Sequence, residues 1–493
     1  MPLKITNSFN KKKEIFIPIN KNKVNIYCCG VTVYDACHLG HARSYISWDI
    51  LRRFLTWTGY QVKFIQNFTD IDDKIIAKAA SENCSVDDVT EKNIKSFYYD
   101  MDALNIIRPD KMPRATKCLE EIILLIEKLI KKRKAYCING NVYFSVESYS
   151  EYGKLSGRDI TQQKTNADGR LTKTKKLNQY DFALWKASKE GEVFYESPWG
   201  RGRPGWHIEC SAMALKELGP TLDIHLGGSD LIFPHHENEI AQSEAANEEK
   251  LSKYWMHNGM VNVNGQKMSK SLGNFTTIRN LLDSGVTPMA LRFFILQTHY
   301  RKPLDFTQEA LDSASKGWNK INSVISSGLN LANKFKWPLA KNNSKDKVLL
   351  PKLEGENKDL YQRFINFLED DLNTAGALSI IFEVSKEFRY FEKHNTFDTN
   401  KRTDIKLEEL FKTLELLLHL TYILGLEFED NKLNKINKDS KELTEIEIED
   451  AIKKRKESKA NKDYKTADNI REFLQSKGIY LVDKPNGSTD WHA

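Results

Sequence analysis

Several features that would place this chain in a particular compartment are missing from the sequence. No apolar run approaches the ~18 residues that a membrane-spanning helix requires. The first residues, M-P-L-K-I-T-N-S, lack the apolar segment of a secretory signal peptide. Cysteine is scarce: seven residues, an odd number spread over 493 positions, argue against a disulfide framework and favour reduced thiols. We therefore expect a protein of the cytoplasm with no membrane partner.

The composition is that of a large globular protein. Apolar residues make up 40% of the chain, which is ample for buried cores. A chain of this length predicts about two to four domains. The net charge of +7 permits a polyanionic partner, although a generally lysine-rich composition would give the same sum. The position of the basic residues is therefore more informative than their total.

The N-terminal part of the chain alternates between strand and helix patterns. Val24–Cys29 is an apolar, β-prone run, and His41–Thr58 carries apolar side chains at helical spacing, with Gly59 as its stop. Gln61–Gln66 predicts a second strand, and a further helix begins near Asp73. This order predicts a βαβ unit, and hence an α/β fold with a parallel sheet.

The patterns continue differently further along the chain. Pro113–Lys134 and Pro234–Asn247 predict helices, and Thr221–Leu226 predicts a return to the sheet. From about Glu309 to Leu426 helical spacing dominates, and Ile452–Lys477 is a basic helix pattern. The sequence therefore predicts an α/β part followed by an α-helical part and a small basic C-terminal part.

The tetrapeptide H-L-G-H, which ends at His41, lies at a predicted strand-to-helix turn. Backbone N–H groups and the helix dipole favour an anion at such a turn, and Gly40 lets a nucleotide approach the backbone closely. The imidazoles of His38 and His41 could then hydrogen-bond phosphoryl oxygens. A tetrapeptide of this form also arises by chance in many proteins.

A second candidate is K-M-S-K-S, from Lys267 to Ser271, between Gly265 and Gly273. Two lysines among small hydroxyl residues suit a mobile loop that closes over a triphosphate, with Lys270 supplying charge as pyrophosphate leaves. An ordinary solvated basic loop is the alternative.

Candidate metal ligands occur in three places. Cys28 and Cys29 are neighbouring thiols, Cys210 lies in G-W-H-I-E-C-S-A-M, and P-H-H-E-N-E places His235 and Glu239 four residues apart on one helix face. Zinc accepts cysteine, histidine and glutamate ligands. A lone buried cysteine is more often a small apolar residue, and H-H-E is often exposed.

H-L-G-H and K-M-S-K-S, in this order, resemble the two signature motifs of class I aminoacyl-tRNA synthetases. The resemblance implies a Rossmann-type fold with ATP, accompanied by Mg²⁺, at the carboxyl ends of the strands. Four further segments resemble cysteinyl-tRNA synthetases: Y-C-C-G-V-T-V-Y-D, N-F-T-D-I-D-D-K-I, G-W-H-I-E-C-S-A-M and F-P-H-H-E-N-E-I-A-Q-S-E. This resemblance runs from about Ile15 to Thr307, and more weakly to the end.

The cysteinyl-tRNA synthetase resemblance implies one Zn²⁺ per chain, held by Cys29, Cys210, His235 and Glu239. The family's first ligand directly precedes the glycine of C-G-x-T-V-Y-D, which selects Cys29 rather than Cys28. Strand alternation agrees that only one of two neighbours faces the site.

Further residues complete the predicted site. We expect His38, His41, Lys267 and Lys270 to be catalytic, and His38, Gly40, His41 and Lys270 to bind ATP. We expect the amino acid to contact Gly30, Thr69, Trp206 and Asp230. Thr69 lies at a strand end, and Asp230 follows two glycines, where a carboxylate suits ribose or an ammonium group. Trp206 precedes Cys210, although core packing is an equal alternative for a lone tryptophan.

The C-terminal third is expected to bind tRNA. Basic residues crowd Ala451–Thr466, among them Lys453, Lys454 and Arg455, which suits phosphate contact. A solvated helix face with interleaved acidic residues is the alternative. The ending K-P-N-G-S-T-D-W-H resembles the family's tail, which implies anticodon recognition, and Trp491 could stack on a base.

The predicted domains follow these patterns. Residues 1–112 and 196–264 would be the halves of the Rossmann-type catalytic domain, with an insertion at 113–195 between them. Residues 265–308 would be a linker domain with the K-M-S-K-S loop, 309–428 a helical bundle that binds tRNA, and 429–493 a basic linker with a small anticodon-binding domain.

The predicted reaction is ATP-dependent ligation of L-cysteine to tRNA(Cys) through a cysteinyl-adenylate, by a monomer. Zinc would bind the substrate thiolate and so reject serine, because size alone separates the two amino acids poorly. The main alternative is a ligase of the same fold that joins activated cysteine to a small amine without tRNA. A catalytically dead RNA-binding paralogue, and a structural zinc in a synthetase for another amino acid, are the others.

Overall fold

The structure is a computed structural model that describes most of the 493 residues. The described residues are 2–158, 176–269, 272–337, 339, 353–394, 405–429, 445–460, 463, 466–467, 470–471, 474, 480–483 and 489–492. The chain divides into two compact units, Met1–Glu427 and Phe428–Ala493. Across the described residues, no helix combines the length and the apolar character that crossing a membrane would require.

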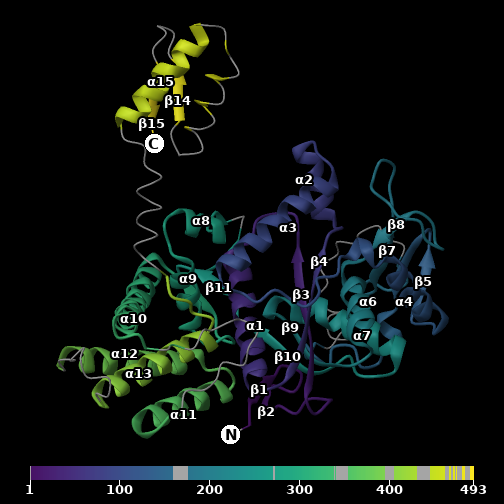
Figure 1. Ribbon diagram of the computed structural model, residues 1–493. Helices are drawn as coiled ribbons and strands as arrows, with labels where there is room; N and C mark the ends of the chain where they lie inside the picture. Colours follow the sequence, from purple (N-terminus) through teal and green to yellow (C-terminus); the bar gives the residue numbers. More distant parts are fainter. Residues whose placement is uncertain are drawn as a thin grey trace. The chain divides into compact units, whose positions relative to one another are not determined.

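The centre of the first unit is a four-stranded parallel sheet with the order β10-β9-β3-β4 (Figure 1). Its strands are β3 (Lys23–Thr32), β4 (Gln61–Thr69), β9 (Leu222–Gly228) and β10 (Ser252–Asn258). Helix α1 (Leu39–Trp57) connects β3 to β4, which confirms the predicted βαβ unit. The strand order also explains how distant parts of the chain meet, because β9 pairs directly with β3.

Helices cover both faces of this sheet, and β3 alternates between the two. Val24, Ile26 and Cys28 pack in the core that includes α1. Tyr27 and Cys29 pack in the opposite core, with α6 (Trp206–Leu218) and α7 (Glu237–Asn247). Alternate residues of a strand point to opposite faces, so neighbouring cysteines have different surroundings.

An insertion lies between the two halves of the sheet in sequence. It contains an antiparallel sheet of order β5-β6-β7-β8 and one main helix. These elements are α4 (Leu119–Lys131), β5 (Ala135–Ile138), β6 (Asn141–Phe144), β7 (Phe182–Ala187) and β8 (Gly202–Pro204). The helix predicted from Pro113 starts later, because Ala115–Lys117 form a separate 3₁₀ turn. Before the insertion come α2 (Asp73–Glu82) and α3 (Val86–Ala103).

The remaining elements of the first unit surround the sheet. A hairpin of β1 (Lys4–Asn7) and β2 (Lys12–Ile15) precedes it. A small sheet of order β12-β11-β13 follows it, together with two helices. These elements are β11 (Val261–Val263), β12 (Gln266–Lys267), α8 (Ile278–Asp283), α9 (Pro288–Leu296) and β13 (Leu304–Phe306).

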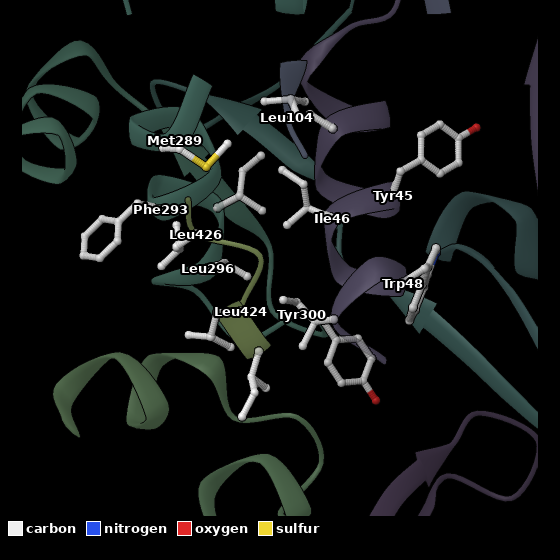
Figure 2. Close-up of a cluster of buried hydrophobic side chains, with 14 of the residues drawn as sticks. Tyr45, Ile46, Trp48, Leu104, Met289, Phe293, Leu296, Tyr300, Leu424 and Leu426 are labelled. Carbon is white, nitrogen blue, oxygen red and sulfur yellow. The ribbon is translucent and has the colours of Figure 1, made fainter. Parts of the chain in front are cut away.

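Four long helices then confirm the helical pattern of the sequence: α10 (Gln308–Phe335), α11 (Gly355–Glu369), α12 (Thr374–His394) and α13 (Ile405–Ile423). The segment after α13 returns to the part of the unit that contains α1 and α9. Figure 2 shows Leu424 and Leu426 near the α9 residues Phe293 and Leu296, with Ile46 of α1 in the same cluster. α1 is therefore packed on both the sheet and the helical region.

The second unit contains α15 (Glu445–Ala460) and a hairpin of β14 (Tyr480–Asp483) and β15 (Thr489–His492). The first part of the predicted basic helix, residues 452–460, is thus present. The observed helix begins earlier, at Glu445, and the rest of the predicted range lies largely outside the described residues. The predicted linker between the units lies largely outside the described residues, which resume at Glu445 after position 429.

Candidate active site

Four buried side chains with metal-binding atoms meet at the carboxyl end of β3. Cys29 comes from β3, Cys210 from α6, His235 from the turn η4 (Ile232–His236), and Glu239 from α7. Their candidate ligand atoms all lie within 4.8 Å of one another. These four residues, the donor cluster, are the four that the resemblance implies as zinc ligands.

Individual contacts within the donor cluster are short. The Cys29 Sγ lies 3.2 Å from Glu239 Oε1 and 3.8 Å from Cys210 Sγ. The His235 Nε2 lies 2.9 Å from Glu239 Oε1. Helix α7 begins at Glu237, and the predicted start at Pro234 lies in the π-helical segment η4, which leads directly into α7. The irregular turn nevertheless keeps His235 four residues before Glu239 and aims it at the same point.

Cys28 faces away from the donor cluster. Its side chain is fully buried in the core that α1 closes, among apolar residues. Cys37 is also buried in that core. Cys29 therefore faces the donor cluster, whereas Cys28 and Cys37 lie in the core on the other side of the sheet. Strand alternation predicts this difference for the neighbours Cys28 and Cys29.

Further histidines surround the donor cluster: His207, which like Trp206 precedes Cys210 and could line the amino-acid pocket, and His225 and His236, for which the sequence predicts no role. His225 Nε2 lies 3.5 Å from Cys29 Sγ, and with His236 it forms a second possible donor group that shares Cys29 and Glu239. His207 Nδ1 lies 2.9 Å from His235 Nδ1. The only sequence feature of His225 was its position in the apolar run of β9, and this position is typical of core packing.

The electrostatics of the donor cluster favour an exchange of protons for a cation. The hydrogen bond from Cys29 lowers the pKa of Cys210 to about 7, against the effect of burial. Burial opposes a charge on His235, but the Glu239 carboxylate and the Cys210 thiol raise its pKa to about 10. Burial, together with the neighbouring His235, lowers the pKa of His225 to about 4, although the Glu239 carboxylate acts in the opposite direction. A metal ion that binds here would displace protons from thiol and imidazole, so its affinity should rise with pH.

The donor set fits Zn²⁺. Two thiols, an imidazole and a carboxylate are ligands that zinc accepts in tetrahedral sites. The Glu239 Oε2 atom is buried and makes no hydrogen bond within the described part of the chain. His225 Nε2 lies 3.4 Å from this oxygen without forming a hydrogen bond to it, and a bound cation would satisfy the buried carboxylate.

A cavity of about 420 Å³ extends from the donor cluster along the carboxyl ends of the strands. Cys29, Gly30, Trp206 and Asp230 line one end of it. Other lining residues come from the H-L-G-H segment and from the strand β12 with its loop: His38, Gly40, His41, Lys267, Met268 and Ser269. The cavity therefore joins a metal-binding end to an end that suits phosphates.

His38 and His41 act together at the start of α1. The Nδ1 atom of His38 accepts a hydrogen bond from the Gly40 backbone at 3.0 Å, and the Nδ1 of His41 accepts one from the His38 backbone at 3.2 Å. Their rings stack with centroids 3.7 Å apart. Because Nδ1 is the acceptor in each neutral ring, Nε2 carries the proton and is the donor atom of each ring. A side chain at Gly40 would meet the His38 ring at 2.8 Å.

The K-M-S-K-S segment is only partly described. Lys267 ends β12 and lines the cavity, and the Ser269 backbone donates to Asn274 Oδ1 at 2.8 Å. Lys270, which was expected to be catalytic and to bind ATP, lies outside the described residues.

The predicted amino-acid contacts differ in their placement. Trp206 stacks on His235 with ring centroids 4.3 Å apart, while 37% of its surface remains exposed. Gly30 N donates to Asn67 Oδ1 at 2.8 Å. Thr69 is buried at the end of β4, bonded to Asn67, and is not part of the cavity lining. Trp206, Gly30 and Asp230 therefore line the cavity, whereas Thr69 does not.

The predicted tRNA contacts of the second unit also differ. Lys453 and Lys454 are exposed on α15. Arg455 is only 3% exposed, and this burial argues against a direct contact with phosphate. Trp491 lies in β15, and its side chain is not among the described ones.

Comparison with known proteins agrees with this geometry. A family model for the catalytic domain of class I tRNA synthetases (C) matches residues 15–316, and one for the DALR domain matches 363–429. Among solved structures, methionyl-tRNA synthetase of Mycobacterium tuberculosis in complex with methionyl-adenylate aligns with a TM-score of 0.56 at 16% identity, over 82% of this chain and 90% of that one. A putative arginyl-tRNA synthetase of Campylobacter jejuni aligns with a TM-score of 0.54 at 15% identity, over 84% and 94%. Fold and catalytic-domain match together define a class I aminoacyl-tRNA synthetase.

Similar proteins identify the family within the class I synthetases to which this chain belongs. Cysteine–tRNA ligase of Prochlorococcus marinus strain NATL1A is 57% identical over 100% of this chain and 99% of its own length. That of strain MIT 9303 is 52% identical over the same shares, and that of Synechococcus sp. strain WH7803 is 52% identical over 99% of both chains. The chain belongs to the cysteine–tRNA ligase family.

Proposed function

We propose that this protein attaches L-cysteine to tRNA(Cys) in two steps, through a cysteinyl-adenylate. The observation that carries the proposal is the buried donor cluster at one end of a cavity that His38 and His41 also line. The names of the relatives support the amino acid, and the two signature motifs support activation with ATP. As in other synthetases, Mg²⁺ would accompany the ATP.

Choice of the amino acid would take place at the donor cluster. Cys29, Cys210, His235 and Glu239 would hold one Zn²⁺, which when bound lowers the pKa of a thiol and prefers sulfur to a hydroxyl oxygen. The protein's own contribution is burial, because a ligand bound there is removed from water. Each ~1.4 kcal/mol of preference for cysteine over serine is a tenfold difference in binding, so several kcal/mol would make editing unnecessary.

Activation would take place at the other end of the cavity. The cysteine carboxylate attacks the α-phosphorus of ATP, the bond to the pyrophosphate oxygen breaks, and pyrophosphate leaves. The Nε2 protons of His38 and His41, held by their backbone hydrogen bonds, would stabilise the developing negative charge. Lys267 and Lys270 would neutralise the leaving pyrophosphate.

Transfer would follow on the same adenylate. A hydroxyl of the terminal ribose of tRNA attacks the cysteinyl carbonyl carbon, and AMP leaves. Lys453 and Lys454, both exposed on α15, would contact the phosphates of tRNA. We also propose that the chain has the six domains predicted from its sequence and that it acts as a monomer in the cytoplasm.

The proposed function is tested with the full-length, zinc-loaded protein. It should exchange pyrophosphate into ATP only when cysteine is present, and should then acylate tRNA(Cys) transcripts. Exchange without any tRNA charging would favour the alternative, a ligase that joins cysteine to a small amine. Absence of cysteine-dependent exchange would contradict the proposal altogether.

A further inference from the structure

One lysine of the cavity wall has no role in the site described above. Lys74 lines the cavity, and so does Tyr34 from the segment that follows β3. The Lys74 Nζ atom lies 5.4 Å from the centre of the Tyr34 ring. Lys74 is exposed, whereas Tyr34 is half-buried. A cation and an aromatic ring thus lie together in a part of the cavity wall to which the proposed binding of cysteine and ATP assigns no residue.

Lys74 is held in the first turn of α2. Asp72 caps this helix, and its Oδ1 atom accepts a hydrogen bond from the Lys74 backbone at 2.9 Å. The cap fixes the backbone of Lys74 but leaves its ammonium group at the cavity. Because α2 directly follows β4, Lys74 approaches the cavity from the edge strand of the sheet.

Carboxylates near Lys74 in sequence are already engaged elsewhere. Asp73 pairs with Lys186 at 2.8 Å and with Arg203. Asp70 accepts hydrogen bonds from Thr116, at 2.9 Å from its backbone N and 2.6 Å from its hydroxyl. Within the described part of the chain Lys74 forms no ion pair. Its charge is therefore available to a ligand.

Among the described residues, Lys267 is the other lysine that lines the cavity, and it approaches from a different element. It lies on β12, and the next residue, Met268, comes within 3.7 Å of the position that a side chain at Gly40 would occupy. Lys267 is thus associated with the H-L-G-H turn, where the phosphates of ATP would bind. Lys74 lies on α2, which follows the edge strand β4, and it is not needed to explain the ATP phosphate site.

We infer that Tyr34 and Lys74 form the binding position for the 3′-terminal nucleotides of the tRNA. This inference rests on the proposed function. Single-stranded nucleic acids are held by positive charge against the backbone and by aromatic rings against the bases. Tyr34 offers a ring for stacking, and Lys74 offers its charge to a phosphate as it leaves the ring. Both residues would position the terminal ribose for transfer and would contribute nothing to formation of the adenylate.

The experiment compares the two half-reactions in the full-length, zinc-loaded protein. The variants are Lys74→Ala, Lys74→Arg and Tyr34→Leu. Lys78→Ala is the matched control, because Lys78 lies one turn further along α2 and is paired with Glu82 at 3.0 Å. Pyrophosphate exchange with cysteine measures activation. Single-turnover transfer from preformed adenylate, and kcat/KM for tRNA as a function of salt, measure the second step.

Lys74→Ala and Tyr34→Leu should each lower the transfer rate or kcat/KM for tRNA by about tenfold, with exchange within about twofold of wild type. Loss of one phosphate contact should also reduce the slope of log KM against log salt by about 0.7. Lys74→Arg should retain most of the transfer, and Lys78→Ala should behave as wild type.

Two results would overturn the inference. Exchange and transfer that fall together in Lys74→Ala would assign Lys74 to ATP, and transfer at the wild-type rate would exclude a tRNA contact. A wild-type protein that performs exchange but charges no tRNA would instead overturn the proposed function, and this inference with it.

Discussion

Replacement of Gly30 by alanine should disrupt the donor cluster through the backbone of the sheet. Gly30 lies where the register of β3 against β4 shifts, between Cys28 and Val31. A Cβ atom at Gly30 would lie 1.6 Å from the carbonyl oxygen of Asn67. This neighbour is backbone, so no side-chain rotation relieves the clash, and β3 has to move away from β4.

The size of the effect follows from these contacts. Overpacking of this kind costs about 1–3 kcal/mol, and loss of the hydrogen bond from Gly30 to Asn67 costs about 1 kcal/mol more, so the free energy of unfolding should fall by about 2–4 kcal/mol. Metal–ligand distances tolerate deviations of only about 0.2 Å. Displacement of the adjacent Cys29 should therefore weaken zinc binding by about 10- to 100-fold.

The assay is zinc content after dialysis against a graded series of chelator concentrations, together with thermal unfolding. Gly376→Ala is the matched control, because its Cβ would meet the Phe367 ring at 2.3 Å, far along the chain in the helical region. That variant should lose stability but retain zinc. A Gly30→Ala protein with the zinc affinity of wild type would refute this reasoning.

Four further variants test other parts of the account. Cys29→Ala should abolish zinc binding, whereas Cys28→Ala should retain it, since Cys28 is packed on the opposite face; zinc lost only in Cys28→Ala would show the ligand assignment to be off by one. Asp49→Asn should lower the free energy of unfolding by about 3–5 kcal/mol, because it leaves buried Arg292 and its neighbour without their carboxylate; a thermal midpoint equal to that of wild type would contradict this. Burial and neighbouring glutamates raise the pKa of Glu387 to about 7, so folding favours its protonated form. The stabilisation from this protonated carboxyl group is complete below about pH 4.3 and is lost as the pH rises through 7. Glu387→Gln should therefore flatten the dependence of the free energy of unfolding on pH in that window. An unchanged pH dependence would disprove this prediction.

The sequence predicted the fold well where periodicity is strong. The runs at Val24–Cys29 and Gln61–Gln66, with a helix between them, became β3, α1 and β4 because their apolar side chains have one periodicity and clear stops. The predicted ends of some helices differ from the observed ones. The helix expected from Pro113 begins at Leu119, since the intervening residues form a 3₁₀ turn that apolar spacing does not reveal.

The candidate site depended on information that spacing does not contain. Cys29 and Cys210 meet because α6 packs on the face of the sheet to which Cys29 points, and no local pattern predicts this packing. The family resemblance supplied the connection. His225 was missed because a histidine within an apolar strand looks like part of the core. Arg455 was grouped with exposed neighbours because a count of basic residues does not distinguish the faces of a helix.

The central claim is that a metal in the donor cluster selects cysteine by its thiol, and amino-acid-dependent pyrophosphate exchange tests it most directly. We predict that the zinc-loaded protein prefers cysteine to serine in kcat/KM by about a thousandfold or more, equivalent to about 4 kcal/mol. Removal of the metal should abolish exchange with cysteine, and added Zn²⁺ should restore it. Serine used as well as cysteine, or exchange with cysteine that survives complete removal of the metal, would contradict the account.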